Sequence, residues 1–188
     1  MANISDTDLK KIVDEVVSGI MREMPSRAGS APVAKPVPST AGKKVVAIGA
    51  DHGGFPLKES LKVFLEENGY MVIDCGTNSP DSVDYPDFAR MVAEKVAAGS
   101  AWRGVMIDGA GIGSCMAANK VHGVRAAMCY DYATAFNSRE HNNANLLTLG
   151  AGLIGPNLAK QILTTFLETE FGGDRHARRV DKIMEIEK

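Results

Sequence analysis

Five short runs of apolar, often β-branched residues alternate with longer segments of helical periodicity from residue 43 onward. The runs that we expect to form strands cover residues 45–48, 71–74, 104–107, 124–128 and 146–149. The expected helices cover residues 56–68, 85–98, a stretch that ends at 120, 132–140 and 156–171. Apolar strands that are each followed by a crossover helix are typical of a parallel sheet buried on both faces. The sequence therefore predicts the α/β class, as a Rossmann-like three-layer sandwich around a five-stranded parallel sheet.

Two segments precede this domain of residues 43–188. Residues 1–24 carry apolar side chains at the three-and-four spacing of an amphipathic helix, and residues 25–42 have the Pro, Ala and Ser content of a linker. A lone helix of this length is only marginally stable in water. We therefore expect its apolar face to lie on its own domain, on a second copy, or on another protein, and the length of the linker favours another protein.

The charge balance excludes several classes of function. Lys and Arg number 21 against 23 Asp and Glu, so the chain has no overall field that would hold nucleic acid or an anionic membrane surface. No apolar run is long enough to span a bilayer, and the N-terminus does not resemble a secretion signal.

The three cysteines are too scattered for a disulfide framework or a metal knuckle. We expect a cytoplasmic protein with no metal site and no nucleic-acid or membrane partner.

Polar residues follow two of the expected strands. Asp51 and His52 come after the first strand, and Asp108 begins the run DGAGIGS after the third. Ligands of parallel sheets bind beyond the carboxyl ends of the strands, and a glycine-rich turn at a helix N-terminus presents N–H groups to an anion. The run is not the GxGxxG of dinucleotide sites, so a phosphate or a developing oxyanion fits better. Alternatively, Asp51 caps a helix and His52 is a surface residue.

Further polar residues lie later in the chain. Asn119 offers an amide near the end of a helix, where a capping role is equally common, and SREHNN adds His141 and Asn142. The run GGDRHARRV places three guanidinium groups within five positions. Such forked donors suit a phosphate, although a solvated charged tail is the alternative.

Together these stretches resemble the type B ribose-5-phosphate isomerases and the galactose-6-phosphate isomerase subunits. The resemblance rests on GADHGGFPLKESLKVFLEENGY, DYPDFA, GAGIGSCMAANKVHGVRAA, SREHNNANLLTLGAGLIG and GGDRHARRV, in order over residues 45–187. It implies the aldose–ketose isomerisation of a sugar phosphate through an enediolate, without metal or organic cofactor. It also implies a homodimer, alone or paired into a tetramer, whose sites combine residues from both chains.

The resemblance implies roles for individual residues. Asp51 and His52 would hold the sugar and help to open its ring, His141 would be the ring-opening acid/base, and Asn142 would bind sugar hydroxyls. The enediolate oxygens and the phosphate would be held by the following residues: Gly109, Ala110, Gly111, Ile112, Gly113, Ser114, Asn119, Arg175 and Arg179.

The chain departs from the family's pattern at four positions. Asp108 stands where a cysteine is the commonest base, and Ser114 stands where another branch has a glutamate base. Ala110 replaces a threonine of the loop, and Gly152 replaces an arginine of the phosphate clamp. We predict that Asp108 is the base and that ribose 5-phosphate is the substrate. The alternatives are a weakly active binding or companion subunit, or an isomerase of another sugar phosphate such as galactose 6-phosphate.

The N-terminal segment carries a second resemblance. An amphipathic helix followed by a Pro/Ala/Ser linker is similar to the encapsulation peptides that tether enzymes to bacterial microcompartment shells. This implies that residues 1–24 dock onto a shell protein, inside a microcompartment in the cytoplasm.

Overall fold

The computed structural model describes residues 11, 15 and 44–187. The chain divides into two compact units, Met1–Thr40 and Ala41–Lys188. Of the first unit, only Lys11 and Glu15 are described, and both are exposed helical residues. The rest of the predicted N-terminal helix and the linker lie outside the described residues.

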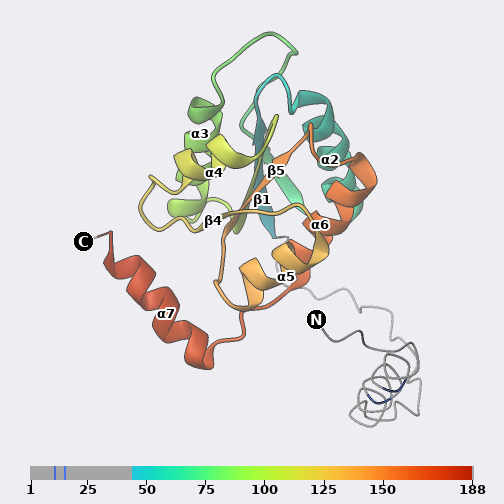
Figure 1. The fold of residues 1–188 in the computed structure, drawn as a ribbon. Helices are drawn as coiled ribbons and strands as arrows, with labels where there is room; N and C mark the ends of the chain where they lie inside the picture. Colours follow the sequence, from blue (N-terminus) through green and yellow to red (C-terminus); the bar gives the residue numbers. More distant parts are fainter. Residues whose placement is uncertain (1–10, 12–14, 16–43, 188) are drawn as a thin grey trace, which may run out of the picture. The chain divides into compact units, whose positions relative to one another are not determined.

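The second unit is built on a five-stranded sheet in the order β2-β1-β3-β5-β4 (Figure 1). All four pairings are parallel. The strands are β1 (Val45–Ala50), β2 (Met71–Asp74), β3 (Arg103–Asp108), β4 (Ala126–Met128) and β5 (Leu146–Gly150). The predicted parallel α/β sheet is therefore confirmed, with each strand within two residues of its expected bounds.

Helices cover both faces of this sheet. They are α2 (Phe55–Glu67), α3 (Tyr85–Ala97), α4 (Ile112–Ala118), α5 (Tyr132–Glu140), α6 (Pro156–Glu168) and α7 (Asp174–Glu185). The buried side chains of α2, α5 and α6 share one apolar cluster, and those of α3 and α4 share the other.

Alternation along the strands explains why both clusters form. Val46 and Ile48 of β1 belong to the cluster under α2, α5 and α6, whereas Ala47 between them belongs to the cluster under α3 and α4. Successive side chains of a strand point to opposite faces, so a strand covered on both sides must be apolar at every position. The continuous apolar runs in the sequence follow from this requirement.

The C-terminal helix α7 was not predicted. It begins after the predicted end of the preceding helix at 171, which in the structure ends at Glu168. Of its side chains only that of Val180 is buried, and Figure 1 shows α7 standing away from the sheet. Ala177, Val180 and Met184 recur at the three-and-four spacing of a helix, but the arginine-rich run that contains them was interpreted only as a phosphate-binding motif or a solvated charged tail.

Candidate active site

The sheet topology separates the predicted site residues into two groups. Asp51 follows β1 and Asp108 ends β3, so both lie at the carboxyl end of the sheet. His141 follows α5, which runs back from β4 toward the start of β5 at Leu146. Asp108 pairs with Gly150, four residues further along β5 than Leu146, which corresponds to about 13 Å of strand. Within one chain, the two groups therefore lie at opposite ends of the sheet.

The first group includes the loop that follows β1. The buried carboxylate of Asp51 accepts a hydrogen bond from Gly54 N at 2.9 Å and so orders the turn before α2, whose N-cap is Gly54 without a side-chain cap bond. A Cβ added to Gly53 would lie 3.8 Å from Gly109 N, which places this loop against the glycine-rich loop after β3. The exposed ring of His52 accepts a hydrogen bond at Nδ1 from Val83 N at 3.3 Å. The structure thus brings together the Asp51 loop and the loop that begins at Asp108.

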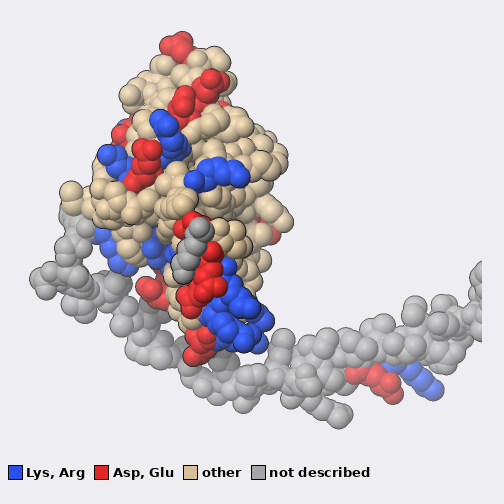
Figure 2. All heavy atoms as spheres, turned by 90° about the vertical axis from the view of Figure 1, so that its left-hand side faces the viewer, with Lys and Arg blue, Asp and Glu red and all other residues tan. Residues whose placement is uncertain are grey.

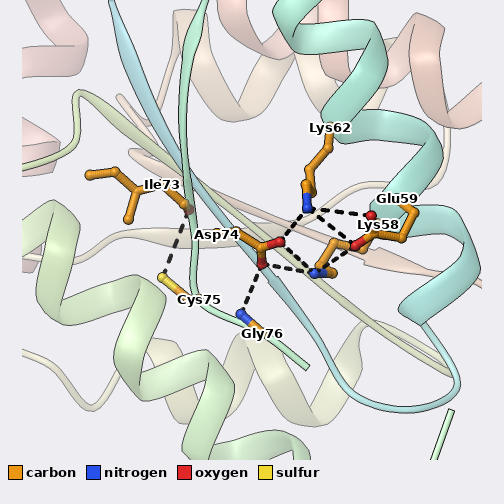
Figure 3. Close-up of polar contacts among 7 residues, drawn as sticks. All are labelled: Lys58, Glu59, Lys62, Ile73, Asp74, Cys75 and Gly76. Carbon is orange, nitrogen blue, oxygen red and sulfur yellow. Dashed lines mark hydrogen bonds and ion pairs between the residues drawn. The ribbon is translucent and has the colours of Figure 1, made fainter. Parts of the chain in front are cut away.

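An ion-pair network supports this end of β1 from the side of β2 (Figure 3). Asp74 accepts hydrogen bonds from the fully buried Lys58 at 2.7 and 2.9 Å and from Gly76 N at 2.9 Å, and it also pairs with Lys62. Gly76 O in turn accepts from Ala50 N, the residue before Asp51, at 2.7 Å. Burial would raise the pKa of Asp74, but the hydrogen bonds from Lys58 and Lys62 outweigh it and lower that pKa.

Asp108 is buried and points back into its own loop. One carboxylate oxygen accepts from Ala110 N at 2.8 Å and also from Gly111 N. The other accepts from Ser114 N at 3.0 Å and from the Ser114 hydroxyl at 2.5 Å. The predicted base is thus also the group that orders the Gly109–Gly113 loop, and it engages some of the N–H groups that we expected to face an oxyanion.

Two glycines of this loop are required by its shape. Gly111 has a φ of 78°, which favours a residue without a Cβ. At Gly113 an added Cβ would lie 2.5 Å from a carbon of the Tyr85 ring. Gly152, where the family has an arginine, donates from its N to Gly109 O at 3.0 Å, so that position borders the same loop.

Asn119 lies at the other end of α4 and does not reach the Gly109–Gly113 loop. Its amide nitrogen donates to Cys115 O and to Ala126 O, both at 3.0 Å, and its oxygen accepts from Ala126 N at 2.8 Å. This geometry matches the capping alternative, because the side chain joins the end of α4 to β4. Cys115 packs beside it, with its thiol 3.4 Å from Ala126 O.

The second group gathers where α5 ends and α7 begins. The imidazole of His141 stacks on that of His176, with ring centroids 4.2 Å apart and planes inclined by 6°. His141 Nδ1 is 2.7 Å from the Asn137 amide nitrogen, and His141 Nε2 is 3.1 Å from a carboxylate oxygen of Glu140. Asn142, which is exposed, donates to Asn137 O at 3.1 Å.

Exposed arginines complete this second group. Arg175 Nε donates to His176 Nε2 at 3.3 Å, and Arg179 lies one turn further along α7. Figure 2 shows Lys and Arg side chains gathered with carboxylates at the lower end of the face that carries α7. His176 was named in the sequence motif but received no predicted role; only the contact between α5 and α7 reveals its position.

Neither a metal centre nor a membrane span is found in the described part of the chain. Across residues 11, 15 and 44–187, no group of three His, Cys, Asp or Glu side chains could hold a metal ion. In the same residues no helix is long and apolar enough to cross a bilayer.

A parallel sheet with an imidazole, carboxylates and a glycine-rich loop beyond its carboxyl ends defines an α/β enzyme of small polar ligands. Residues 46–183 match the family described as ribose/galactose isomerase, so the chain belongs to this family and is a sugar-phosphate isomerase. The chain is 43% identical over 144 residues to ribose-5-phosphate isomerase B of Escherichia coli, covering 77% of this chain and 97% of that one. It is 41% identical over 139 residues to the D-erythrulose-4-phosphate isomerase of Pectobacterium atrosepticum, covering 73% and 91%.

A solved structure is similar in the same region. The ribose-5-phosphate isomerase B of Clostridium thermocellum is 52% identical and superposes with a TM-score of 0.75, covering 76% of this chain and 97% of that one. The match covers the sheet and its helices, and the predicted family and fold are confirmed.

Proposed function

We propose that this isomerase interconverts ribose 5-phosphate and ribulose 5-phosphate. The observation that carries this proposal is the near-complete coverage of the 52% identical ribose-5-phosphate isomerase B, together with the polar loops at the carboxyl end of the sheet. The relative that acts on D-erythrulose 4-phosphate is less similar, at 41% identity. Four-carbon sugar phosphates are therefore the second substrate class to assay.

We further propose that the active site forms between two copies of the chain. In one chain His141, Asn142, Arg175 and Arg179 lie at the opposite end of the sheet from Asp108, so each chain carries two incomplete halves. A two-fold dimer completes two sites at once, because the half with Asp108 on each chain meets the half with His141 on the other chain.

The exposed surface beside the second group favours this arrangement. A groove of about 720 Å³ runs along the outer edge of β4, between α5 and the end of α7. Ile183 and Ile186 at its border are 45% and 84% exposed. Apolar side chains at a groove border are typical of surfaces that a partner covers.

In this shared site the residues act in sequence. Arg175 and Arg179 of the partner subunit hold the phosphate, and His141 of the partner subunit opens the sugar ring as acid/base. Asp108 then takes the proton from C2 and returns it to C1, while a second proton moves from the oxygen on C2 to the oxygen on C1. N–H groups of the Gly109–Gly113 loop stabilise the enediolate that exists between these two transfers.

The environment of Asp108 favours one alternative function. A carboxylate that accepts hydrogen bonds from Ala110, Gly111 and Ser114 must release one of them before it can take a proton from carbon. If it never does, the protein is a sugar-phosphate binder with little turnover. A bound ligand at about 100 times its Kd would then still stabilise the fold by ~2.7 kcal/mol.

Turnover by the purified full chain tests these two functions. We expect ribulose formation from ribose 5-phosphate, and we expect Asp108→Asn to reduce kcat by about a hundredfold or more, since general base catalysis contributes that much. The matched control is Asp87→Asn, an exposed carboxylate on α3, which should leave kcat unchanged. Full activity in Asp108→Asn would show that another group is the base, and thermal stabilisation by ribose 5-phosphate without turnover would establish the binder.

We also propose that residues 1–24 dock this enzyme onto a microcompartment shell protein through the linker of residues 25–42. The amphipathic spacing of the first segment and the composition of the second support this proposal. Deletion of residues 1–42 should leave isomerase activity intact and abolish co-purification with a shell protein. Retained co-purification, or loss of folding on deletion, would contradict the proposal.

A further inference from the structure

We propose that His176 is a positioning residue that holds the imidazole of His141 for ring opening and connects it to Arg175 of the phosphate clamp. This inference rests on the proposed function and adds a residue to which neither the sequence motifs nor the resemblance gave a role.

Stacking fixes the plane of the His141 ring. The two imidazoles lie nearly parallel, at 6°, with centroids 4.2 Å apart, so the His141 ring cannot turn about its χ2 without losing contact with His176. Contacts at the ring edges, to Asn137 at 2.7 Å and Glu140 at 3.1 Å, set its rotation within that plane. General acid catalysis depends on such orientation, because the proton must be delivered along a hydrogen bond to the ring oxygen of the sugar.

The contact with Arg175 defines the protonation state of the His176 imidazole. A guanidinium group can only donate, so the 3.3 Å contact from Arg175 Nε requires His176 Nε2 to be an unprotonated acceptor. His176 is then neutral and carries its proton on Nδ1. A phosphate held by Arg175 is thereby connected, through His176, to the ring that opens the sugar.

Several charged groups face His176. Desolvation lowers the pKa of His176, His141, Arg175 and Arg179 lower it further, and Glu140 raises it. The direction agrees with the neutral, accepting ring that the contact with Arg175 requires. These charged groups lie on or next to both α5 and α7, so their effect on the pKa of His176 depends on the contact between the two helices.

The choice of substrate separates ring opening from the later proton transfer. Ribose 5-phosphate is cyclic in solution and must be opened. Erythrose 4-phosphate cannot form a five-membered ring, because the oxygen that would close it carries the phosphate. Both substrates need the phosphate clamp and the base, but only ribose 5-phosphate needs a positioned ring-opening acid. The relative that acts on erythrulose 4-phosphate motivates the second substrate.

Two variants of the full-length protein test the inference. We expect His176→Ala to lower kcat/KM for ribose 5-phosphate about tenfold more than for erythrose 4-phosphate, a fraction of the full effect of a general acid. His176→Phe keeps a stacking ring but lacks the nitrogen that accepts from Arg175. We therefore expect this variant to restore the wild-type ratio of the kcat/KM values for the two substrates and to raise KM equally for both. His122→Ala removes an exposed histidine elsewhere and serves as the control.

Equal losses for both substrates in a folded His176→Ala protein would overturn the inference, because they would indicate a structural role alone. Unchanged kinetics in that variant would overturn it too. If His176→Ala fails to fold, a His176→Phe protein with a selective defect on ribose 5-phosphate contradicts the stacking role, and one without it supports that role. A wild-type protein inactive on both substrates would instead refute the proposed function.

Discussion

At the residue scale, Asp108 holds the glycine-rich loop that follows it in one conformation. Its carboxylate gathers donors from three residues of a loop that it immediately precedes. A carboxylate can do this where a thiol cannot, because it offers two oxygens with four acceptor positions. The aspartate that stands in place of the family's cysteine therefore supports the loop, in addition to its proposed role as the base.

The packing of Gly113 against Tyr85 yields a second prediction at this scale. We expect Gly113→Ala to destabilise the protein by about 1–3 kcal/mol, the usual cost of overpacking, because the new Cβ would lie 2.5 Å from the Tyr85 ring. Urea unfolding measures the change. Gly109→Ala is the matched control, since a Cβ there meets nothing within 4 Å.

Removing the Tyr85 ring should reverse the loss of stability caused by Gly113→Ala. Tyr85 is 38% exposed, so Tyr85→Ala is tolerable by itself, and the double variant should recover most of the stability that Gly113→Ala loses. Additive losses in the double variant would show that the ring does not limit residue 113.

The sequence supplied the candidate site residues but not their contacts. The position of Asp108 at a strand end follows from the apolar pattern alone. Its side chain points to the N–H groups of its own loop, where Gly111 has a positive φ, and the sequence reveals neither feature. His176 and His141 lie 35 positions apart, and their stacking depends on how α7 meets α5. Asn119 was ambiguous between ligand and cap, and only its contacts with Ala126 distinguish the two.

At the scale of elements, the sheet was predictable because its strands are buried on both faces and must be apolar throughout. Helix α7 was not predicted, although its apolar side chains recur at helical spacing, because its arginine-rich run was interpreted as a phosphate-binding motif or a solvated tail. Of the α7 side chains only that of Val180 is buried, so the apolar side of this helix is largely uncovered in the described part of the chain. Such an element is a natural contributor to a surface shared between copies.

The network that joins α2 to the end of β2 yields a prediction about stability and pH. Asp74→Asn leaves the fully buried Lys58 with only Glu59, and we expect a loss of about 2 kcal/mol at pH 7, below the usual cost for a fully buried pair because a quarter of the Asp74 side chain is exposed. Urea unfolding at several pH values measures it, with the exposed Asp181→Asn as the control.

The sign of the pH dependence follows from the lowered pKa of Asp74. Its contribution is fully present above the ordinary value of 3.8 and is lost as the pH falls from there through the folded pKa. The difference between wild type and Asp74→Asn should therefore shrink below about pH 4. A difference that stays constant down to pH 2 would contradict the role assigned to the network.

At the scale of the whole molecule, the proposed shared site leaves each single chain with two incomplete halves. One half carries Asp51 and Asp108, and the other carries His141 and the arginines of α7. A dimer with two-fold symmetry forms two complete sites, so activity should fall with dilution below the dimer dissociation constant.

Complementation between inactive variants is the most direct test of this central claim. Asp108→Asn and His141→Asn are each expected to be inactive as homodimers. When equal amounts are refolded or co-expressed together, half of the dimers are mixed, and each mixed dimer has one intact site, so the account predicts about a quarter of wild-type activity. Activity that stays at the level of the separate variants, with mixed dimers shown to be present, would contradict a site shared between two chains.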